Sequence, residues 1–165
     1  DEEQVLVLSP DVKIYDKTPA MSSVQLTKLV VDNVKQKIKD KQISSDIVVL
    51  NFAAPDMIGH TGNVEAGVTC CEKVDSCVSE IVKTYLDSNG TILITADHGN
   101  IEKMINQKTG EIFTEHTTNP VPFILINDKM KDVKLRKNGI LGEIAPTKLE
   151  LLSMKKPKEL RGRPV

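Results

Sequence analysis

The sequence contains no tryptophan and few other aromatic residues, with two tyrosines and three phenylalanines among 165 residues. Val, Ile and Leu must therefore fill the core of any globular fold that the chain adopts. A chain of this length is expected to form one domain, large enough for a sizeable core.

The sequence also lacks an excess of charge and any long apolar run. Its formal net charge of −1 gives no electrostatic argument for binding nucleic acid or an anionic membrane. No apolar stretch is long enough to cross a bilayer, and none has the pattern of a secretory signal. We therefore expect neither a nucleic-acid partner nor a membrane association.

Cysteine is scarce as well, with only Cys70, Cys71 and Cys77 in one predicted helix. An odd number of cysteines in one helix is a poor disulfide framework, and the Cys-x-x-Cys spacing of zinc sites is absent. We interpret them as core or semi-buried thiols of a reducing compartment, and we expect a cytoplasmic protein.

Hydrophobic patterning predicts an α/β fold. Apolar runs predict strands at Val5–Leu8, Ile47–Leu50, Thr91–Thr95 and Val121–Ile126. Three- and four-residue periodicity predicts helices that start after Ser22 or Ser23, after Asn63, at Ile101 and at Ile144. The strand, helix and strand over residues 47–95 form a βαβ unit, which would make its two strands parallel.

The helix after Asn63 is expected to pack an apolar stripe on the sheet. Its stripe residues are Val64, Val68, Cys71, Val74, Val78, Ile81, Val82 and Tyr85. The lysines of the preceding helix are interpreted as a solvated face, and we assign no binding role to them.

Candidate ligands follow the predicted strands. Asp56 and His60 come after the second strand, four residues apart, so they share one side of a helical turn. Asp97 and His98 come directly after the third strand, and His116 shortly precedes the fourth. Because ligands of open α/β sheets sit beyond the carboxyl ends of the strands, these residues predict a single site.

Two carboxylates and three imidazoles suit a borderline divalent cation such as Mn²⁺ or Zn²⁺. Five ligands exceed one tetrahedral site, which indicates two metal ions. Paired ions are typical of sites that clamp the attacking and leaving oxygens in phosphoryl transfer.

At these residues the sequence also resembles a known family. The stretch Asn51-Phe52-Ala53-Ala54-Pro55-Asp56-Met57-Ile58-Gly59-His60-Thr61-Gly62 is similar to the signature of the cofactor-independent (2,3-bisphosphoglycerate-independent) phosphoglycerate mutases. Similar too are Thr95 to Asn100, His116 to Pro122, Ser9-Pro10, Tyr15-Asp16, Pro19 to Ser22, and Ile144 to Thr147. The Ala-Asp-His-Gly element alone is shared with the wider alkaline phosphatase superfamily.

The resemblance implies a three-layer alkaline-phosphatase-like fold, with helices on both faces of a mostly parallel sheet. It implies an isomerase that interconverts 3- and 2-phosphoglycerate through a phosphoserine, without 2,3-bisphosphoglycerate. Two divalent ions are implied, foremost Mn²⁺, with Mg²⁺, Co²⁺ or Zn²⁺ as alternatives. Asp56, His60 and His116 would hold one ion, and Asp97 and His98 would contribute to the other.

The sequence departs from the family in what it lacks. The family's nucleophilic serine, another aspartate ligand, an active-site lysine and an inserted substrate-binding domain all lie upstream of the matching segment. Ser9, Ser22 and Ser44 match no nucleophile motif. We therefore expect residues 1–165 to be the C-terminal segment of the phosphatase-like domain, with no second domain. This chain alone should be inactive and should self-associate, whereas the full-length protein should be a monomer.

Two other functions stay open at this point. The chain could come from a phosphatase or another phosphomutase of the same superfamily, which would share the metal ligands. It could also be a non-catalytic domain stabilised by metal, since the sequence supplies no nucleophile.

Overall fold

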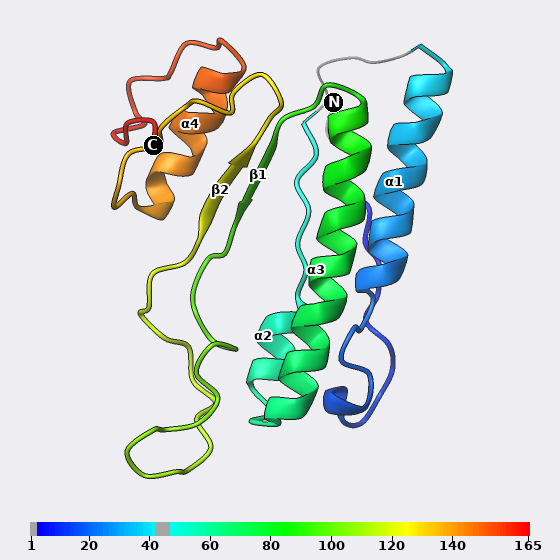
Figure 1. The fold of residues 1–165 in the computed structure, drawn as a ribbon, viewed down its shortest axis with the longest axis vertical. Helices are drawn as coiled ribbons and strands as arrows, with labels where there is room; N and C mark the ends of the chain where they lie inside the picture. The colour runs from blue at the N-terminus through cyan, green and yellow to red at the C-terminus, as the bar shows by residue number, and fades with distance from the viewer. Residues whose placement is uncertain (1–2, 42–46) are drawn as a thin grey trace. The chain divides into compact units, whose positions relative to one another are not determined.

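The computed structural model describes residues 3–41 and 47–165. The chain divides into two compact units, Asp1–Asp128 and Lys129–Val165. Its helices and strands are η1 (Tyr15–Lys17), α1 (Ser23–Lys39), α2 (Ala54–Gly59), α3 (Val64–Asp87), β1 (Ile92–Thr95), β2 (Phe123–Ile126), η2 (Leu141–Glu143) and α4 (Ile144–Leu151) (Figure 1). None of the helices in the described ranges is long and apolar enough to cross a membrane.

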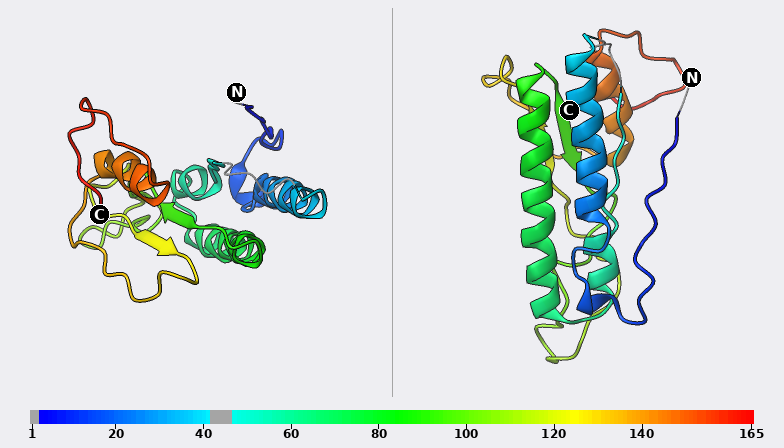
Figure 2. Two further views of the ribbon diagram at one scale, coloured as in Figure 1. Left: turned by 90° about the horizontal axis from the view of Figure 1, so that it is seen from above. Right: turned by 90° about the vertical axis from the view of Figure 1, so that its right-hand side faces the viewer.

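The first unit is built around the long helix α3, which packs against α1 and α2. Figures 1 and 2 show α1 and α3 side by side and pointing the same way. One buried cluster joins Val30 and Val31 of α1 to Ile81 of α3, and a second joins α2 to the first turns of α3. Asp56 lies on α2 and His60 directly follows it, so the second cluster fixes the position of the helix that bears both residues.

The predicted starts of three helices, α1, α3 and α4, are confirmed. Asn63 caps α3, because its side-chain oxygen accepts a hydrogen bond from the backbone N–H of Ala66 at 3.1 Å. Ser22 occupies the cap position of α1, but its hydroxyl instead donates to the carbonyl of Leu8 at 2.6 Å. The Asn89-Gly90 turn ends α3 as predicted, with Asn89 at a positive φ of 59°.

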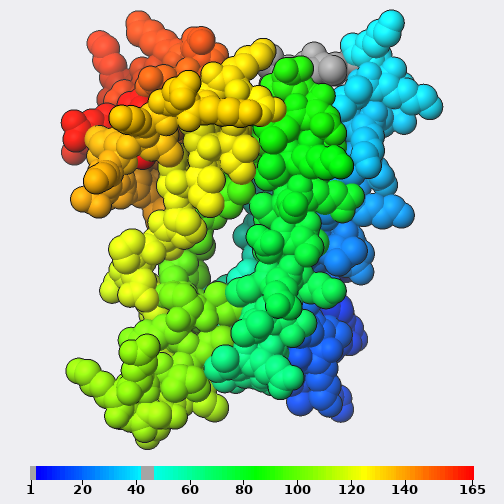
Figure 3. Space-filling model, viewed as in Figure 1, coloured from blue at the N-terminus to red at the C-terminus, as the bar shows by residue number. Residues whose placement is uncertain are grey.

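The predicted apolar stripe of α3 is wrong in its first half. Val64 and Val68 are 48% and 55% exposed, and Cys71 is exposed, whereas Ala66, Gly67 and Cys70 are buried. The reason is the packing partner, since the start of α3 turns its small residues toward α2 and leaves the valines outside. In Figure 3, one side of α3, drawn in green, is not covered by other segments along the length of the helix.

The predictions of strands at Val5–Leu8 and Ile47–Leu50 are wrong for this structure, because neither segment pairs with another strand in the described residues. Between Ile47 and Ala53 the chain forms no helix or strand, and Leu50 and Phe52 pack on the cluster shared by α1 and α3. Val49 is 82% exposed. A parallel strand is normally covered on both faces, and here helices cover only one.

The two strands that are present pair with each other. β1 and β2 are antiparallel, with Ile92 opposite Ile126 and Thr95 opposite Phe123. This confirms the strand predictions at Thr91–Thr95 and Val121–Ile126. The parallel βαβ arrangement predicted for Ile47–Leu50 and Thr91–Thr95 is not formed in the described residues, because Ile47–Leu50 is not a strand there. A mostly parallel, three-layer sheet is therefore not formed by the described residues.

The segment between the two strands contains a turn where a helix was predicted. Residues Ile101–Ile105 form a turn and then an isolated bridge from Ile105 to Ile112. The predicted turn at Asn106–Gly110 is confirmed, with the N–H of Gly110 donating to the carbonyl of Asn106 at 2.8 Å. The bridge holds Ile105 in extended backbone, which is incompatible with a helix.

The second unit consists of η2, α4 and the segments around them. α4 has Pro146 in its first turn, as predicted, but ends at Leu151 instead of Met154. Arg136 and Thr147 tie the unit together through hydrogen bonds to the side chain and the backbone carbonyl of Glu143. Ser44 falls outside the described residues.

Candidate metal centre

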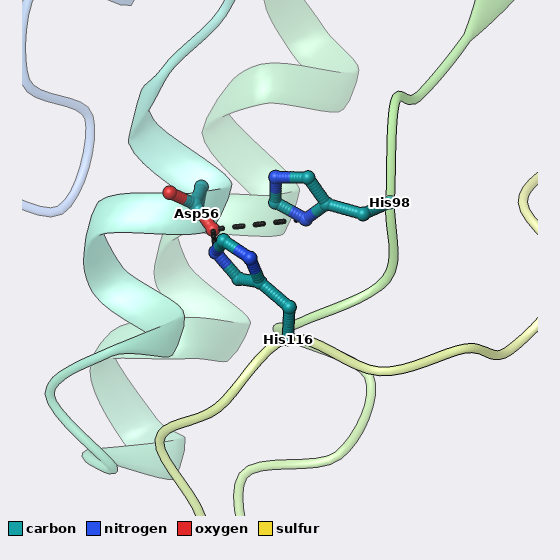
Figure 4. Close-up of side chains that lie close together, drawn as sticks. All are labelled: Asp56, His98 and His116. Atoms are coloured by element: carbon teal, nitrogen blue, oxygen red, sulfur yellow. Dashed lines mark ion pairs between the residues drawn. The ribbon is translucent and has the colours of Figure 1, made fainter.

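Three segments that are distant in the sequence meet at the candidate site. Asp56 lies on α2, His98 in the loop after β1, and His116 in the segment that leads to β2 (Figure 4). The ligand atoms of these three residues all lie within 4.8 Å of one another. These three of the five predicted site residues therefore lie at one place.

His60 joins the same cluster from the end of α2. Its Nε2 lies 3.4 Å from Oδ1 of Asp56 and 3.2 Å from Nε2 of His116, and that nitrogen of His116 lies 3.1 Å from the same carboxylate oxygen. Ligand atoms bound to one ion at about 2.1 Å lie about 3–3.5 Å apart. Asp56, His60 and His116 therefore have the spacing of a shared ion.

A hydrogen bond fixes which nitrogen of His60 faces the cluster. Nδ1 of His60 lies 2.6 Å from the carbonyl oxygen of Thr114, and a carbonyl can only accept, so Nδ1 carries the proton. In the neutral ring the lone pair is then on Nε2, toward Asp56 and His116. This is the arrangement that metal-ligating histidines usually have.

His98 lies between the two aspartates. Its ring stacks on that of His116 with centroids 3.7 Å apart. Its Nδ1 lies 4.0 Å from Oδ1 of Asp56, is buried and has no hydrogen-bond partner. Its Nε2 lies 3.7 Å from Oδ2 of Asp97. An unpartnered imidazole nitrogen beside a carboxylate is a donor set that fits a divalent cation.

Asp97 is the one predicted ligand that does not point into the cluster. Its side chain is 88% exposed and approaches Nε2 of His98, whereas Nδ1 of His98 is the nitrogen beside Asp56. The structure thus brings together Asp56, His60, His98 and His116, and leaves Asp97 at the edge of the group.

The charge of Asp56 is set by its neighbours. Partial burial of the carboxyl opposes ionisation, but the hydrogen bond from Asn100 and the three nearby imidazoles outweigh it, so the pKa of Asp56 is lowered. The carboxylate is therefore ionised at neutral pH, the state that a cation requires.

Two neighbours of the site were not predicted to have a role. Asn100 donates from Nδ2 to Oδ1 of Asp56 at 2.6 Å, and Glu102 accepts the backbone N–H of Asn100 at 2.7 Å. Asn100 belongs to the Thr95–Asn100 stretch, which is similar to the family signature. That similarity gives Asn100 no particular role, and only the fold places its side chain beside Asp56.

The chain is similar to known proteins over nearly all of its length. A family model described as the metalloenzyme superfamily matches residues 1–156. The 2,3-bisphosphoglycerate-independent phosphoglycerate mutases of Acetivibrio thermocellus and Clostridium kluyveri are 46% and 45% identical to the chain. These matches cover 98% and 99% of this chain. The chain spans only 30% of the length of each of these relatives.

A solved structure is also similar. The phosphoglycerate mutase of Leishmania mexicana, whose crystal structures were determined at low cobalt concentration, matches with a TM-score of 0.81 and 27% identity. The match covers 95% of this chain and 30% of that one. The chain belongs to the metalloenzyme superfamily, and its similarity to 2,3-bisphosphoglycerate-independent phosphoglycerate mutases extends over nearly all of its length.

Proposed function

We propose that this chain supplies metal ligands to a 2,3-bisphosphoglycerate-independent phosphoglycerate mutase, an enzyme that interconverts 3- and 2-phosphoglycerate in glycolysis and gluconeogenesis. The observation that carries the proposal is the cluster of Asp56, His60 and His116 at ion-sharing distances. It occurs in a chain that is 46% identical to such a mutase over 161 residues.

The proposed site holds two divalent ions, with Mn²⁺ first and Mg²⁺, Co²⁺ or Zn²⁺ as alternatives. Asp56, His60 and His116 are the proposed ligands of one ion, and Asp97 and His98 contribute to the other. When bound, such ions lower the pKa of a nucleophilic hydroxyl and neutralise charge on the transferring phosphoryl group.

The chain's own residues prepare the ligands. The carbonyl of Thr114 holds the proton of His60 on Nδ1, so that Nε2 is free to bind. Asn100 donates to the carboxylate of Asp56 and stabilises its ionised form. Together these contacts fix the orientation of two ligands before any ion arrives, which reduces the entropic cost of binding.

The rest of the reaction requires groups that we propose to come from outside these residues. They are the serine that takes the phosphoryl group, a further aspartate ligand, a lysine and substrate-binding arginines. In the longer protein we also propose that Val5–Leu8 and Ile47–Leu50 become strands of a mostly parallel, three-layer sheet. The exposed apolar faces of both segments support this. We propose a cytoplasmic, monomeric enzyme.

Manganese binding by the chain tests the first part of the proposal. The electron paramagnetic resonance signal of free Mn²⁺ should fall when the wild-type chain takes up the ion. Uptake by His60→Ala should be strongly reduced. We expect one ion to bind more tightly than the other, because Asp97 and His98 alone leave most coordination positions to water. Two equal, tight sites per chain would contradict this assignment, and no uptake would refute the metal site.

Activity of the complete protein tests the second part. The protein expressed from the complete reading frame should convert 3-phosphoglycerate to 2-phosphoglycerate without added 2,3-bisphosphoglycerate, while residues 1–165 alone should not. Hydrolysis of a generic phosphoester without mutase activity would instead support a phosphatase of the same superfamily. Metal binding without either activity would support a non-catalytic domain.

A further inference from the structure

We propose that Asn100 and Glu102 are positioning residues, which hold α2 and the His116 segment together so that Asp56, His60 and His116 converge. The inference rests on the proposed metal site and adds to it the two residues that set its geometry. Neither side chain is a predicted ligand.

The first half of this arrangement joins the loop after β1 to α2. Nδ2 of Asn100 donates to the backbone carbonyl of Asp56 at 3.2 Å and to its carboxylate at 2.6 Å. Only the amide nitrogen can face a carboxylate, so the orientation of the Asn100 side chain follows from chemistry. These two hydrogen bonds hold both the backbone of α2 at Asp56 and the carboxylate of Asp56 in place.

The space for Asn100 is provided by Gly59 on the same helix. Asn100 is only 5% exposed, and a Cβ added to Gly59 would lie 2.4 Å from its Oδ1. The Asn100 side chain therefore fits between α2 and its own loop because position 59 has no side chain.

The second half joins the same loop to the segment that carries His116. One carboxylate oxygen of Glu102 accepts the backbone N–H of Asn100 at 2.7 Å. The other accepts from the hydroxyl of Thr117 and from Nδ2 of Asn119 at 2.8 Å. The N–H of Thr117 also donates to the carbonyl of Gly99 at 2.7 Å.

The hydrogen bonds at position 102 require an ionised carboxylate. Glu102 accepts hydrogen bonds on both oxygens and donates none, which an ionised carboxylate can do and an amide cannot. Glu102→Gln keeps the size of the side chain but turns an amide nitrogen toward one set of donors. The substitution should therefore release either Asn100 or the Thr117–Asn119 segment.

The test reads the positions of the histidines directly, in the metal-free chain. The His60 and His116 rings have centroids 5.0 Å apart, and those of His98 and His116 are 3.7 Å apart. Nuclear Overhauser contacts between these rings should appear in the wild type and be weakened or lost in Glu102→Gln. The exposed Glu111, for which no side-chain contact is described, provides the matched control Glu111→Gln.

Manganese affinity is the second readout. Groups that orient metal ligands typically contribute 10- to 100-fold in affinity, so Asn100→Ala and Glu102→Gln should bind Mn²⁺ about 10- to 100-fold more weakly. Thr117→Ser keeps the hydroxyl and should bind like the wild type, whereas Thr117→Val should not. The absorption spectrum of the Co²⁺ form should change in the same variants, because it reports ligand geometry.

The outcomes separate this inference from the proposed function. Wild-type ring contacts and affinity in Glu102→Gln and Asn100→Ala would overturn the inference. A wild-type chain that binds no Mn²⁺ would overturn the proposed metal site. Ring contacts that still depend on Glu102 would then support its positioning role alone.

Discussion

At the scale of single residues, two helix glycines, Gly59 and Gly67, leave no free space for an added Cβ. Gly59 and Gly67 both lie in helices, where replacing glycine with alanine normally stabilises by about 1 kcal/mol. At both positions a new Cβ would meet a neighbour too closely, at 2.4 Å from Asn100 Oδ1 and at 2.7 Å from Met104 Sδ. The two neighbours differ in their freedom to move.

We predict that Gly59→Ala destabilises the chain by about 1–3 kcal/mol, the usual cost of overpacking. Asn100 cannot withdraw without losing its hydrogen bonds to Asp56. Gly67→Ala is the matched comparison, because the flexible Met104 side chain can shift, and it should cost clearly less. Urea unfolding of both variants measures the difference, and equal costs would show that Asn100 moves as freely as Met104.

At the scale of secondary-structure elements, capping by Asn63 decides where α3 begins. Its side chain accepts from Ala66 and donates to Asp16 at 2.9 Å, so it links the helix start to η1. We predict that Asn63→Ala lowers the free energy of unfolding by about 1 kcal/mol, whereas Asn63→Ser retains most of the capping contribution. Thermal or urea unfolding measures this, and an unchanged Asn63→Ala stability would mean that packing alone fixes the helix start.

In the unit Lys129–Val165, the carboxylate of Glu143 accepts hydrogen bonds from two other residues. Arg136 donates to Oε2 of Glu143 at 2.5 Å, and the N–H of Ile140 donates to the same oxygen at 3.0 Å. The hydrogen bond from Arg136, followed by the one from Ile140, lowers the pKa of Glu143 below its ordinary value of 4.5. The folded state therefore holds the ionised form more strongly than the unfolded state does.

From this we predict a stability contribution that is fully present above the unfolded-state pKa near 4.5 and is lost as the pH falls through the lower folded-state pKa. The stability difference between wild type and Glu143→Gln should therefore shrink as the pH is lowered below about 4.5. Urea unfolding at several pH values measures it. Glu150→Gln, at an exposed position, is the control for removing a carboxylate elsewhere in the same unit.

At the scale of the whole molecule, the chain exposes large apolar side chains in segments that form no helix or strand. Leu6, Leu8 and Val49 are 79%, 75% and 82% exposed. Unpaired extended segments with apolar side chains are the surfaces through which chains associate.

We therefore predict that residues 1–165 self-associate as their concentration rises, through the segments Val5–Leu8 and Ile47–Leu50. Sedimentation velocity over a range of concentrations measures this. Leu6→Lys combined with Val49→Lys should shift the chain toward monomer, while a lysine at the already polar, exposed Asp75 should not. A wild-type chain that stays monomeric at high concentration would contradict the prediction.

Local sequence was sufficient to predict features that depend on neighbouring residues. Asn63 as a cap, the Asn89-Gly90 helix end and the apolar runs of β1 and β2 all follow from short-range chemistry. The sequence also singled out Asp56, His60, His98 and His116, because each lies close to a predicted strand, and these four side chains lie together in the structure.

Tertiary structure decided what local sequence leaves open. An apolar run such as Ile47–Leu50 becomes a strand only if another strand lies beside it, and the sequence of the run does not contain that partner. The same holds for the exposed valines at the start of α3, whose burial depends on which helix packs there. The contacts of Asn100 and Glu102 arise only when three distant segments fold together, because a hydrogen bond depends on position in space and not on spacing along the chain.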